Sequence, residues 1–457
     1  MEKKPNLILI TIDDLRADFV GFLNSQKNIT PNLDKLAKES LIFKNAFSVG
    51  PMTPHSFPAI LTSTYPLDFH GPKKIERPRI LISEVFQNQG YITAAFHSNP
   101  YLSGFFGYDK GWDYFEYLRL EGKRNKILED FKSFLEKISK KLVNWNPKFV
   151  FQIRYLFYKL GIWKPFKKIL AFEINKLLKE FLLANKNSEK PFFIWVHYMD
   201  VHYPFMFFDH YFKDLPLSLS DLIARSLPTF LTRRESLSLP LKKFAFQNMN
   251  LVKRAYEDGI RYLDLQIGNL IDFLKKENLF ENTIICLTSD HGEEFLEHGG
   301  ANHDAKLYQE LLKVPLLIKF PRGEKKGIFE EKVSLIDLAP TLCDIVKVKT
   351  PPSFKGKSFF KEKRKIIFHQ TGENKKEKNR EFAFLNIESL EQCKMAVQFE
   401  NFKYILDFDK KGEELYDLKK DPKEKENIFS KRQDVALKAR KLIEKFLKEN
   451  LPLKIKC

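Results

Sequence analysis

Two short apolar runs that end in polar, acidic pairs constrain the fold of this chain more than any other feature. Residues 7–12 lead directly into Asp13-Asp14, and residues 283–288 lead, after one serine, into Asp290-His291. Apolar runs of this length are typical of parallel strands that are buried on both faces. Because open parallel sheets bind ligands at the carboxyl ends of their strands, we expect both pairs at one functional edge.

A second interpretation of each pair stays open. Asp13-Asp14 could cap a helix that starts at Leu15, and Asp290-His291-Gly292 could form a turn with a cap. Two such pairs, each following an apolar strand, favour a shared site over coincidence.

The first hundred residues alternate between strand and helix signals. Residues 7–12 and 91–97 are predicted strands, whereas residues starting at Thr30 and residues 83–88 are predicted helices. Alternation of this kind indicates an α/β protein, in which helices cover a parallel sheet.

Later segments differ in character. Residues 118–185 carry apolar side chains at helical spacing, which predicts a helical insertion. Residues 206–248 are predicted to form an irregular insertion, before a long helix from about Leu251 to Lys276. After Pro351-Pro352 charged residues become dense and short strands appear, with a closing helix. We predict a catalytic domain over residues 1–345 and a smaller C-terminal α+β subdomain over 346–457.

The amino-acid composition limits the classes of partner that the chain is expected to bind. With 43% hydrophobic and 30% charged residues, the chain is globular rather than disordered. Its net charge of +18 attracts anions, but the lysines are spread out and no nucleic-acid-binding motif is present, so no nucleic acid is expected. The basic, aromatic stretch 149–172 predicts a peripheral contact with lipid or a membrane surface.

The spacing of the cysteines and the N-terminal sequence indicate in which cellular compartment the protein is expected. The four cysteines are far apart, which argues against a disulfide framework or a zinc cluster. The N-terminal apolar run is short, ends in acids and lacks a small-residue cleavage site. No uncharged apolar stretch approaches the roughly 20 residues of a membrane span. We therefore expect a cytoplasmic protein.

The polar residues at the predicted edge suit a cation. Divalent cations prefer carboxylate oxygens, and imidazole joins them for transition metals. Asp13, Asp14, Asp290 and His291 together predict a site for a divalent metal ion, whether Ca, Mn, Mg or Zn. His197 and His202 follow another apolar strand, although His197 could equally be a buried, hydrogen-bonded strand residue.

From Met1 to about Ile345 the chain resembles the catalytic domain of the sulfatase family, within the alkaline-phosphatase superfamily. The motifs that carry the resemblance occur in the family's order, and a C-terminal signature follows them at Leu415-Tyr416-Asp417-Leu418. They are Asn6–Asp18, Thr30–Ala37, Phe43–Phe47, Leu61–Pro66, Pro191–His202, Asn282–Glu293 and Val314–Ile318. The resemblance implies a doubly wound sheet and a metal held by Asp13, Asp14, Asp290 and His291.

The resemblance also implies a nucleophile at the start of the helix that ends in Leu61-Thr62-Ser63. The family has Cys or Ser there, then any residue, then Pro-Ser-Arg, and oxidises the first residue to formylglycine. This chain has Thr53, His55, Ser56 and Phe57 at the corresponding positions. No formylglycine is expected, because oxidation of threonine would give a ketone.

Thr53 could act unmodified. A divalent cation would ease loss of its proton, and the helix N-terminus would favour an anion. The other interpretation is that Thr53 is an N-cap in front of Pro54.

Several histidines and one lysine complete the predicted site. His202 matches the position of a family histidine that contacts the ester oxygens. His298, His303 and Lys306 lie where the family has a His and a Lys or second His, and one of them is expected to contact the substrate. The sequence leaves open which one does so. His197 is the further candidate for substrate binding.

Three functions fit these features. The leading one is a metal-dependent hydrolase of anionic sulfuric or phosphoric esters, with Thr53 favouring a phosphoester or phosphodiester over a sulfate ester. The second is a phosphoryl-headgroup transferase of the same superfamily. The third is a non-catalytic binding protein on a sulfatase scaffold, which the intact metal residues disfavour.

Overall fold

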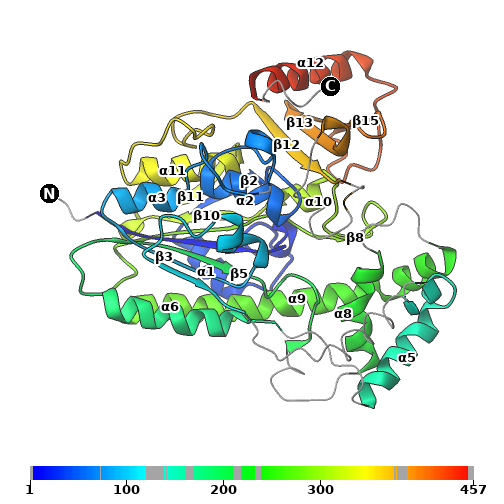
Figure 1. Cartoon of the computed structure of the whole chain (residues 1–457), viewed down its shortest axis with the longest axis horizontal. Coiled ribbons are helices and arrows are strands. Elements are labelled where there is room, and N and C mark those ends of the chain that lie inside the picture. The colour runs from blue at the N-terminus through cyan, green and yellow to red at the C-terminus, as the bar shows by residue number, and fades with distance from the viewer. Residues whose placement is uncertain are drawn as a thin grey trace.

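A computed structural model describes residues 4–72, 74–119, 138–139, 141–160, 168–208, 218–231, 238–374, 377 and 389–450. These residues form one large mixed sheet with helices on both faces, and a smaller antiparallel sheet above it (Figure 1). In sheet order, the strands of the large sheet are β11 (Gly327–Ser334), β2 (Leu41–Phe47), β10 (Leu316–Lys319), β6 (Thr283–Ser289), β1 (Asn6–Ile12), β5 (Phe192–Tyr198), β3 (Ile92–His97) and β4 (Tyr114–Tyr117), with β9 (Lys313–Val314) beside β2.

The centre of the large sheet is parallel. β1 pairs in parallel with β5 and β6, and β3 pairs in parallel with β5 and β4. β10 runs antiparallel to both of its neighbours, β2 and β6. The predicted α/β fold with a doubly wound, mostly parallel sheet is therefore confirmed.

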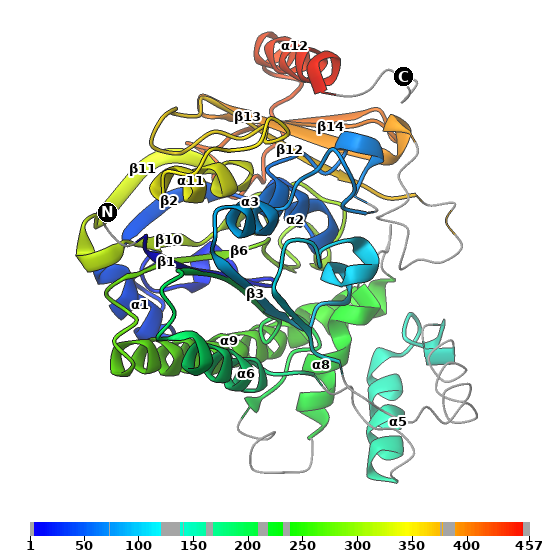
Figure 2. The same cartoon turned by 60° about the vertical axis from the view of Figure 1, so that its left-hand side comes forward.

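Helices cover both faces of this sheet, which explains why its central strands are apolar throughout (Figures 1 and 2). Ile8, Ile10 and Ile12 of β1 join one core cluster, whereas Leu7 and Leu9 join the cluster on the other face. The first face is covered by α1 (Pro31–Lys38), α6 (Ala171–Asn185) and α9 (Leu239–Lys276). The second face is covered by α2 (Thr53–Thr62), α3 (Ile82–Asn88) and α11 (Leu338–Ile345).

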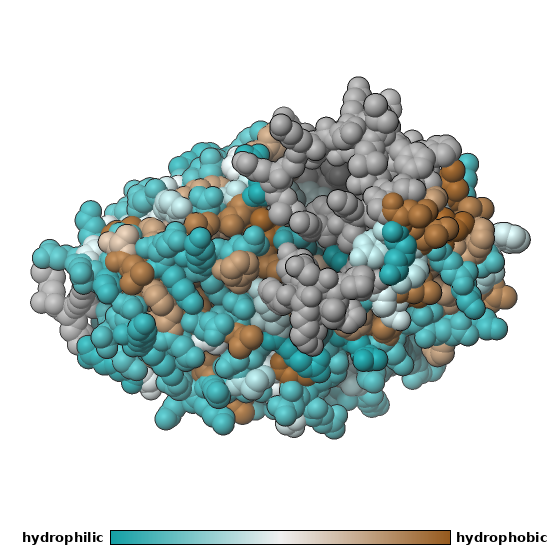
Figure 3. Space-filling view, turned by 90° about the horizontal axis from the view of Figure 1, so that it is seen from below, coloured by the Kyte–Doolittle hydropathy of each residue, from teal (hydrophilic) through white to brown (hydrophobic). Residues whose placement is uncertain are grey.

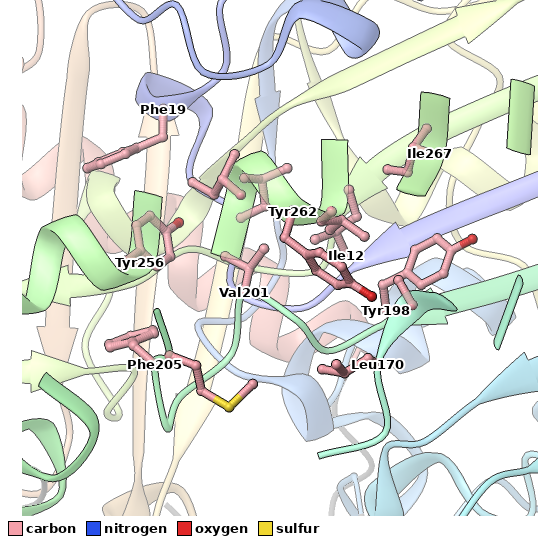
Figure 4. Packing of buried hydrophobic residues seen from close by; sticks show 14 of the residues in the cluster. Ile12, Phe19, Leu170, Tyr198, Val201, Phe205, Tyr256, Tyr262 and Ile267 are labelled. Atoms are coloured by element: carbon pink, nitrogen blue, oxygen red, sulfur yellow. The ribbon is translucent and has the colours of Figure 1, made fainter. Parts of the chain in front are cut away.

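The long helix α9 carries much of the first core. Figure 4 shows Tyr262 of α9 beside Ile12 and Tyr198, at the ends of β1 and β5, and Tyr256 of α9 beside Phe19 and Phe205. This packing supports the strand ends from which the polar residues of the site emerge.

The described parts of the predicted helical insertion are helices. They are α5 (Pro147–Lys159) and α6, whereas residues 120–137, 140 and 161–167 of that segment lie outside the described residues. In Figure 1, α5 lies at the lower right, on the side toward which β1 runs from the N-terminus.

The predicted irregular insertion over 206–248 is wrong for its described part. The structure has α8 (Leu219–Leu231) there, and α9 begins at Leu239 rather than near Leu251; residues 209–217 and 232–237 are not described. The buried apolar residues of α8 have helical spacing, but Pro228 lies among them, and proline normally marks the end of a helix. The sequence pattern therefore does not predict this helix. At the start of α9, Ser238 is the N-cap and its hydroxyl accepts a hydrogen bond from Leu241 N.

The smaller sheet lies beyond the second face and carries the closing helix α12 (Gln433–Asn450) (Figure 2). Its strands are β12 (Ile366–Gly372), β13 (Cys393–Phe399), β14 (Phe402–Asp407) and β15 (Gly412–Asp417). It is attached close to the start of α2, since Gln370 N donates to Val49 O and His369 Nδ1 donates to Ser48 O. The division into domains at residues 345 and 346 stays a prediction. No described helix is long and apolar enough to cross a membrane.

Candidate active site

The sheet register carries the two acidic pairs to the same edge. Ile12 of β1 is paired with Tyr198 of β5 and with Ser289 of β6. The backbone pairing continues one residue further, because Asp13 N donates to Tyr198 O (2.9 Å) and Asp290 N donates to Ile12 O (3.3 Å). The residues that follow β1 and β6 therefore meet where the strands end.

Asp13, Asp14, Asp290 and His291 form a fully buried cluster. His291 Nε2 lies 3.6 Å from Asp13 Oδ1 and 3.3 Å from Asp290 Oδ2, and His291 Nδ1 lies 3.0 Å from Asp14 Oδ1. Asp14 adopts a left-handed backbone conformation, with φ of 64°, and its carbonyl accepts a hydrogen bond from the Tyr256 hydroxyl. Such backbone conformations concentrate at functional sites, where the surrounding structure holds them in place.

The unsatisfied oxygens of this cluster fit a divalent cation. Asp13 Oδ1, both carboxylate oxygens of Asp14, and Asp290 Oδ2 are buried without a hydrogen bond, although imidazole nitrogens approach them. His291 Nδ1 lies 3.0 Å from Gly292 O, a contact that can orient the ring and leave Nε2 to face the carboxylates. Carboxylate oxygens with one imidazole form a suitable ligand set for a divalent metal.

The electrostatics of the cluster also favour a cation. Burial, together with the charge of Asp13, raises the pKa of Asp290 to about 7. Burial, together with the charge of Asp14, raises the pKa of the neighbouring Glu293 to about 8. Ionised carboxylates buried this close to one another are costly unless a positive charge compensates them. Without a cation these two carboxyls therefore hold protons near neutral pH, whereas a bound divalent cation would keep them ionised.

Thr53 lies next to the cluster, at the start of α2. Met52 occupies the N-cap position, so Thr53 is the first helical residue. The Thr53 side chain is buried, with Oγ1 3.5 Å from His291 Nε2. The interpretation of Thr53 as the N-cap in front of Pro54 is therefore wrong, since the chain turns into the helix one residue earlier.

The first turn of α2 contributes its dipole rather than free amide donors. Pro54 has no N–H, and the N–H groups of His55 and Ser56 both donate to Met52 O (2.9 and 3.0 Å). A tight loop precedes this turn, and a Cβ on Gly50 would lie only 2.3 Å from His55 Cβ. Glycine at position 50 thus allows the loop to hold Thr53 against the cluster.

His202 and His303 lie on the open side of the cluster. Their side chains are 19% and 15% exposed, whereas the carboxylate of Asp14 beneath them is fully buried. His303 Nδ1 lies 3.1 Å from Asp14 Oδ1, and His202 Nε2 lies 3.9 Å from Asp14 Oδ2. Burial lowers the pKa of His303, but the carboxylates of Asp14 and Glu293 outweigh it and hold that pKa well above its usual value. His303 can present an N–H group to an anion that enters the site, whereas His202, whose Nδ1 donates to Tyr203 O and whose pKa is lowered by burial, can do so only when it is protonated.

His197 is a buried residue of β5 that holds Asp13. Its Nε2 lies 3.2 Å from Asp13 Oδ2 and its Nδ1 lies 3.0 Å from Thr11 Oγ1, and the ring is fully buried. Because both ring nitrogens of His197 have partners within the protein, this side chain is suited to holding the Asp13 carboxylate in position. Its role in substrate binding stays a prediction that this geometry does not favour.

His298 and Lys306 are both engaged with other residues of the protein. His298 Nδ1 lies 2.6 Å from Glu310 Oε1, its Nε2 lies 3.0 Å from Glu424 O, and its ring stacks on Tyr308. Lys306 Nζ lies 2.6 Å from Glu294 Oε2, in the strand β7 (Glu294–Phe295). Their roles toward the substrate also stay predictions, and these contacts favour structural roles instead.

Three further residues of the site were not among the predicted ligands or catalytic groups. Asn99 Nδ2 donates to Asp13 Oδ2 (2.9 Å), and Glu293 Oε2 lies 3.5 Å from His303 Nδ1. The buried Lys168 donates to the carbonyls of Met199 and His202. The sequence could have indicated Asn99 and Glu293 as site residues, because both closely follow strands of the parallel sheet. No sequence pattern indicated Lys168 as a site residue, since it belongs to the helical insertion.

The mixed sheet with helices on both faces and the smaller antiparallel sheet form an alkaline-phosphatase-like α/β fold. The chain belongs to the sulfatase family, whose model matches residues 5–348. A second family model, N-sulphoglucosamine sulphohydrolase C-terminal, matches residues 297–451. The protein is thus a sulfatase-like ester hydrolase, and enzymes of this family use a divalent metal ion.

Similar proteins span nearly the whole chain. An arylsulfatase from Clostridium perfringens is 26% identical, with 93% of this chain and 90% of that protein covered. An N-acetylglucosamine-6-O-sulfatase from Bacteroides thetaiotaomicron is 23% identical, with 97% and 85% covered. A solved structure of a phosphonate monoester hydrolase from Silicibacter pomeroyi has the same fold, with a TM-score of 0.70, 18% identity, and 99% and 97% of the two chains covered.

Proposed function

We propose that this protein is a metal-dependent hydrolase of anionic esters that uses unmodified Thr53 as its nucleophile, and that it prefers phosphorus to sulfur. The observation that carries the proposal is the position of Thr53 Oγ1, 3.5 Å from His291 Nε2 at the rim of the acidic cluster. A hydroxyl is a weak nucleophile unless a base or a cation activates it. Asp13, Asp14, Asp290 and His291 would hold the divalent cation that eases loss of the hydroxyl proton and offsets the charge of the ester.

The side chains around Thr53 support in-line displacement on an ester of this kind. Thr53 Oγ1 loses its proton as it attacks the phosphorus atom, and the bond from phosphorus to the ester oxygen breaks. The ester oxygen takes up one proton and leaves as the alcohol, so the step releases no net proton. The protonated imidazole of His303 can bind the non-bridging oxygens, and the His202 ring lies beside it on the open side of the cluster. Water then attacks the phosphorus of the threonyl ester, which releases phosphate and restores the hydroxyl of Thr53.

The chemistry of threonine supports phosphorus over sulfur. A sulfated formylglycine hydrate can expel sulfate as the aldehyde forms again, so sulfatases with that residue need no hydrolysis of a sulfated side chain. Threonine lacks this route because its Cβ carries no second hydroxyl, so a threonyl sulfate would need a separate hydrolysis. A threonyl phosphate is the more familiar covalent intermediate.

A substrate panel tests this proposal. Purified protein is assayed with nitrophenyl sulfate, nitrophenyl phosphate, a bis-nitrophenyl phosphodiester and a nitrophenyl phosphonate monoester, each with Ca²⁺, Mn²⁺, Mg²⁺ or Zn²⁺. We expect metal-dependent turnover that is highest on a phosphorus ester. A preference for the sulfate ester would contradict the choice of phosphorus, and turnover that survives complete chelation would contradict the metal dependence.

The nucleophile is tested with Thr53→Ala and Thr53→Ser, and Ser56→Ala is the matched control in the same helical turn. Thr53→Ala should lose roughly 10³-fold or more in turnover, as expected when a nucleophile is removed, whereas Thr53→Ser should keep partial activity because the hydroxyl survives. Ser56→Ala should stay close to the parental rate, since the Ser56 hydroxyl donates to Thr53 O at 3.3 Å and does not reach the cluster. If Ser56→Ala abolished turnover while Thr53→Ala did not, the assignment would move to Ser56.

A further inference from the structure

An apolar face outside the active site remains exposed on α5 and at the start of α9. Eight of the fifteen large hydrophobic side chains that are exposed among the described residues lie within residues 138–160 and 239–246. In Figure 3, brown side chains gather at the right-hand end, the end at which Figure 1 places α5 and α8. The most prominent of them are Trp145, Phe149, Leu156, Leu160, Leu239 and Phe246. We call this set the α5–α9 face.

The α5–α9 face is built by helices that are firmly packed on their inner side. Phe151 of α5 is buried and lies with its ring centroid 5.3 Å from Phe244 of α9 and 5.6 Å from Phe230 of α8. Phe149 and Leu156, seven residues apart, share the outer side of α5, where they are 45% and 54% exposed. The outward side chains are therefore presented by rigid helices that do not need them for their own packing.

The two helices also meet at their ends, which joins the apolar side chains into one surface. Ser238 Oγ donates to Asn144 O at 2.7 Å. Leu239, which is 79% exposed, and Trp145, which is 75% exposed, directly follow the two residues that make this contact. Exposed apolar side chains that gather in this way mark an interaction site, whereas single ones do not.

The two described segments that build the α5–α9 face carry charge of only one sign, although Lys253 at their edge lies 3.9 Å from Glu297. The described residues 141–160 and 238–254 contain eight basic residues and no aspartate or glutamate, although the whole chain has 59 acidic residues against 77 basic ones. The basic residues are Lys141, Lys148, Arg154, Lys159, Lys242, Lys243, Lys253 and Arg254. A second copy of this chain would bring these like charges together at the interface, so self-association through this face is disfavoured.

We propose that the α5–α9 face docks the protein onto an anionic lipid surface. Aromatic and aliphatic side chains enter the boundary between headgroups and acyl chains, while lysines around them bind the anionic headgroups. Lysine stems can also lie along apolar surface with the ammonium group in water. No described helix can cross a membrane, so the contact is peripheral.

Docking in this orientation connects the lipid surface to the active-site edge. α5 packs against α8, and α8 in turn contacts β8 (Ala301–Asn302), which directly precedes His303 of the site. The inference does not depend on Thr53 or on the choice of ester, because it rests on exposed residues that lie outside the site.

Vesicle flotation tests the docking. The full chain is mixed with vesicles of phosphatidylglycerol and phosphatidylcholine, or of phosphatidylcholine alone, at low and at physiological salt. We expect binding to the anionic vesicles, weaker binding as salt rises because the charges become screened, and little binding to phosphatidylcholine alone. Equal binding to both kinds of vesicle, or no binding to anionic ones, would overturn the proposal.

Surface variants identify the face. W145S combined with F246S should weaken binding by about tenfold or more, as expected from the lost burial of apolar area. K148Q combined with K242Q should weaken it by roughly 25-fold at low salt, since each lysine near an anionic membrane contributes about fivefold. The matched control is I328S combined with L437S, which removes two exposed apolar residues from β11 and α12 and should bind like the parent.

Two measurements keep the variants interpretable. Each variant should retain the parental melting temperature and the parental turnover of a small nitrophenyl ester, because none of these residues belongs to the site. Loss of vesicle binding with both properties intact supports the docking face. Vesicle binding at parental strength in both docking variants would overturn it, and so would concentration-dependent dimerisation that disappears in W145S combined with F246S.

Discussion

Asp290→Asn separates a metal ligand from a turn cap, because asparagine keeps one function of this side chain and loses the other. Asp290 Oδ1 accepts a hydrogen bond from His291 N at 2.9 Å, and an amide oxygen can still accept it. Asp290 Oδ2, by contrast, is buried, has no hydrogen bond and faces His291 Nε2 at 3.3 Å. The substitution therefore removes a charge and a ligand while it preserves the local turn.

The magnitude follows from the linkage between binding and stability. At a metal concentration of 100 times Kd, binding stabilises the folded state by about 2.7 kcal/mol. If loss of the Asp290 ligand weakens binding about 100-fold, the same metal concentration equals Kd and the stabilisation falls to roughly 0.4 kcal/mol. Asp290→Ala should behave in the same way toward metal, but should cost about a further 1 kcal/mol in the metal-free protein, because the hydrogen bond from His291 N is lost.

Urea unfolding provides the assay, with each protein measured after chelation and again with added metal. We expect the metal-free Asp290→Asn variant to be at least as stable as the metal-free parent, because one of several crowded buried carboxylates is gone. The reasoning would be refuted if Asp290→Asn kept the full metal-induced stabilisation, or if the metal-free variant lost several kcal/mol.

Three other predictions concern different parts of the structure. Gly50→Ala should lower turnover and cost about 1 to 3 kcal/mol of stability, because its Cβ would clash with His55 in the first turn of α2; turnover and melting measurements at the parental level would contradict this. Burial lowers the pKa of His369 to about 3, so the protein should lose about 2 kcal/mol of stability from this residue between pH 7 and pH 5, as the unfolded state takes up a proton below its pKa of about 6.5. Above pH 6.5 the contribution of His369 to the free energy of unfolding should be fully present. Urea unfolding of His369→Gln should lack this part of the pH dependence, and equal pH dependence in parent and variant would contradict the reasoning. His298→Phe should reduce the free energy of unfolding by roughly 1 to 3 kcal/mol, because Glu310 loses its buried partner, but should leave KM for a small ester near the parental value. A large rise in KM with unchanged stability would instead indicate that His298 binds the substrate.

The part of the site that could be predicted from the sequence is the part that local pattern encodes. An apolar strand followed by acids places Asp13 and Asp290 at the carboxyl edge of a parallel sheet, and this needs no knowledge of the rest of the fold. The resemblance to sulfatases then located Thr53 at the start of a helix. Both signals are contained in short stretches of sequence.

The parts that could not be predicted depend on contacts between distant segments. His298 lies in a motif that suggests substrate binding, but Glu424, 126 residues further along the chain, supplies the carbonyl that engages its ring. Lys168 reaches the site only because α6 begins beside the loop after β5. The helix α8 was missed because Pro228 interrupts its pattern, although tertiary packing buries most of its residues.

The central claim is that the Thr53 hydroxyl forms a covalent ester with the substrate's phosphoryl group. Mass spectrometry of protein that is acid-quenched during turnover of a phosphorus ester tests this claim most directly. The account predicts that one phosphoryl group is attached to the peptide that contains Thr53, and that Thr53→Ala carries none. Phosphorylation of another residue during turnover, or equal labelling in Thr53→Ala, would contradict the account.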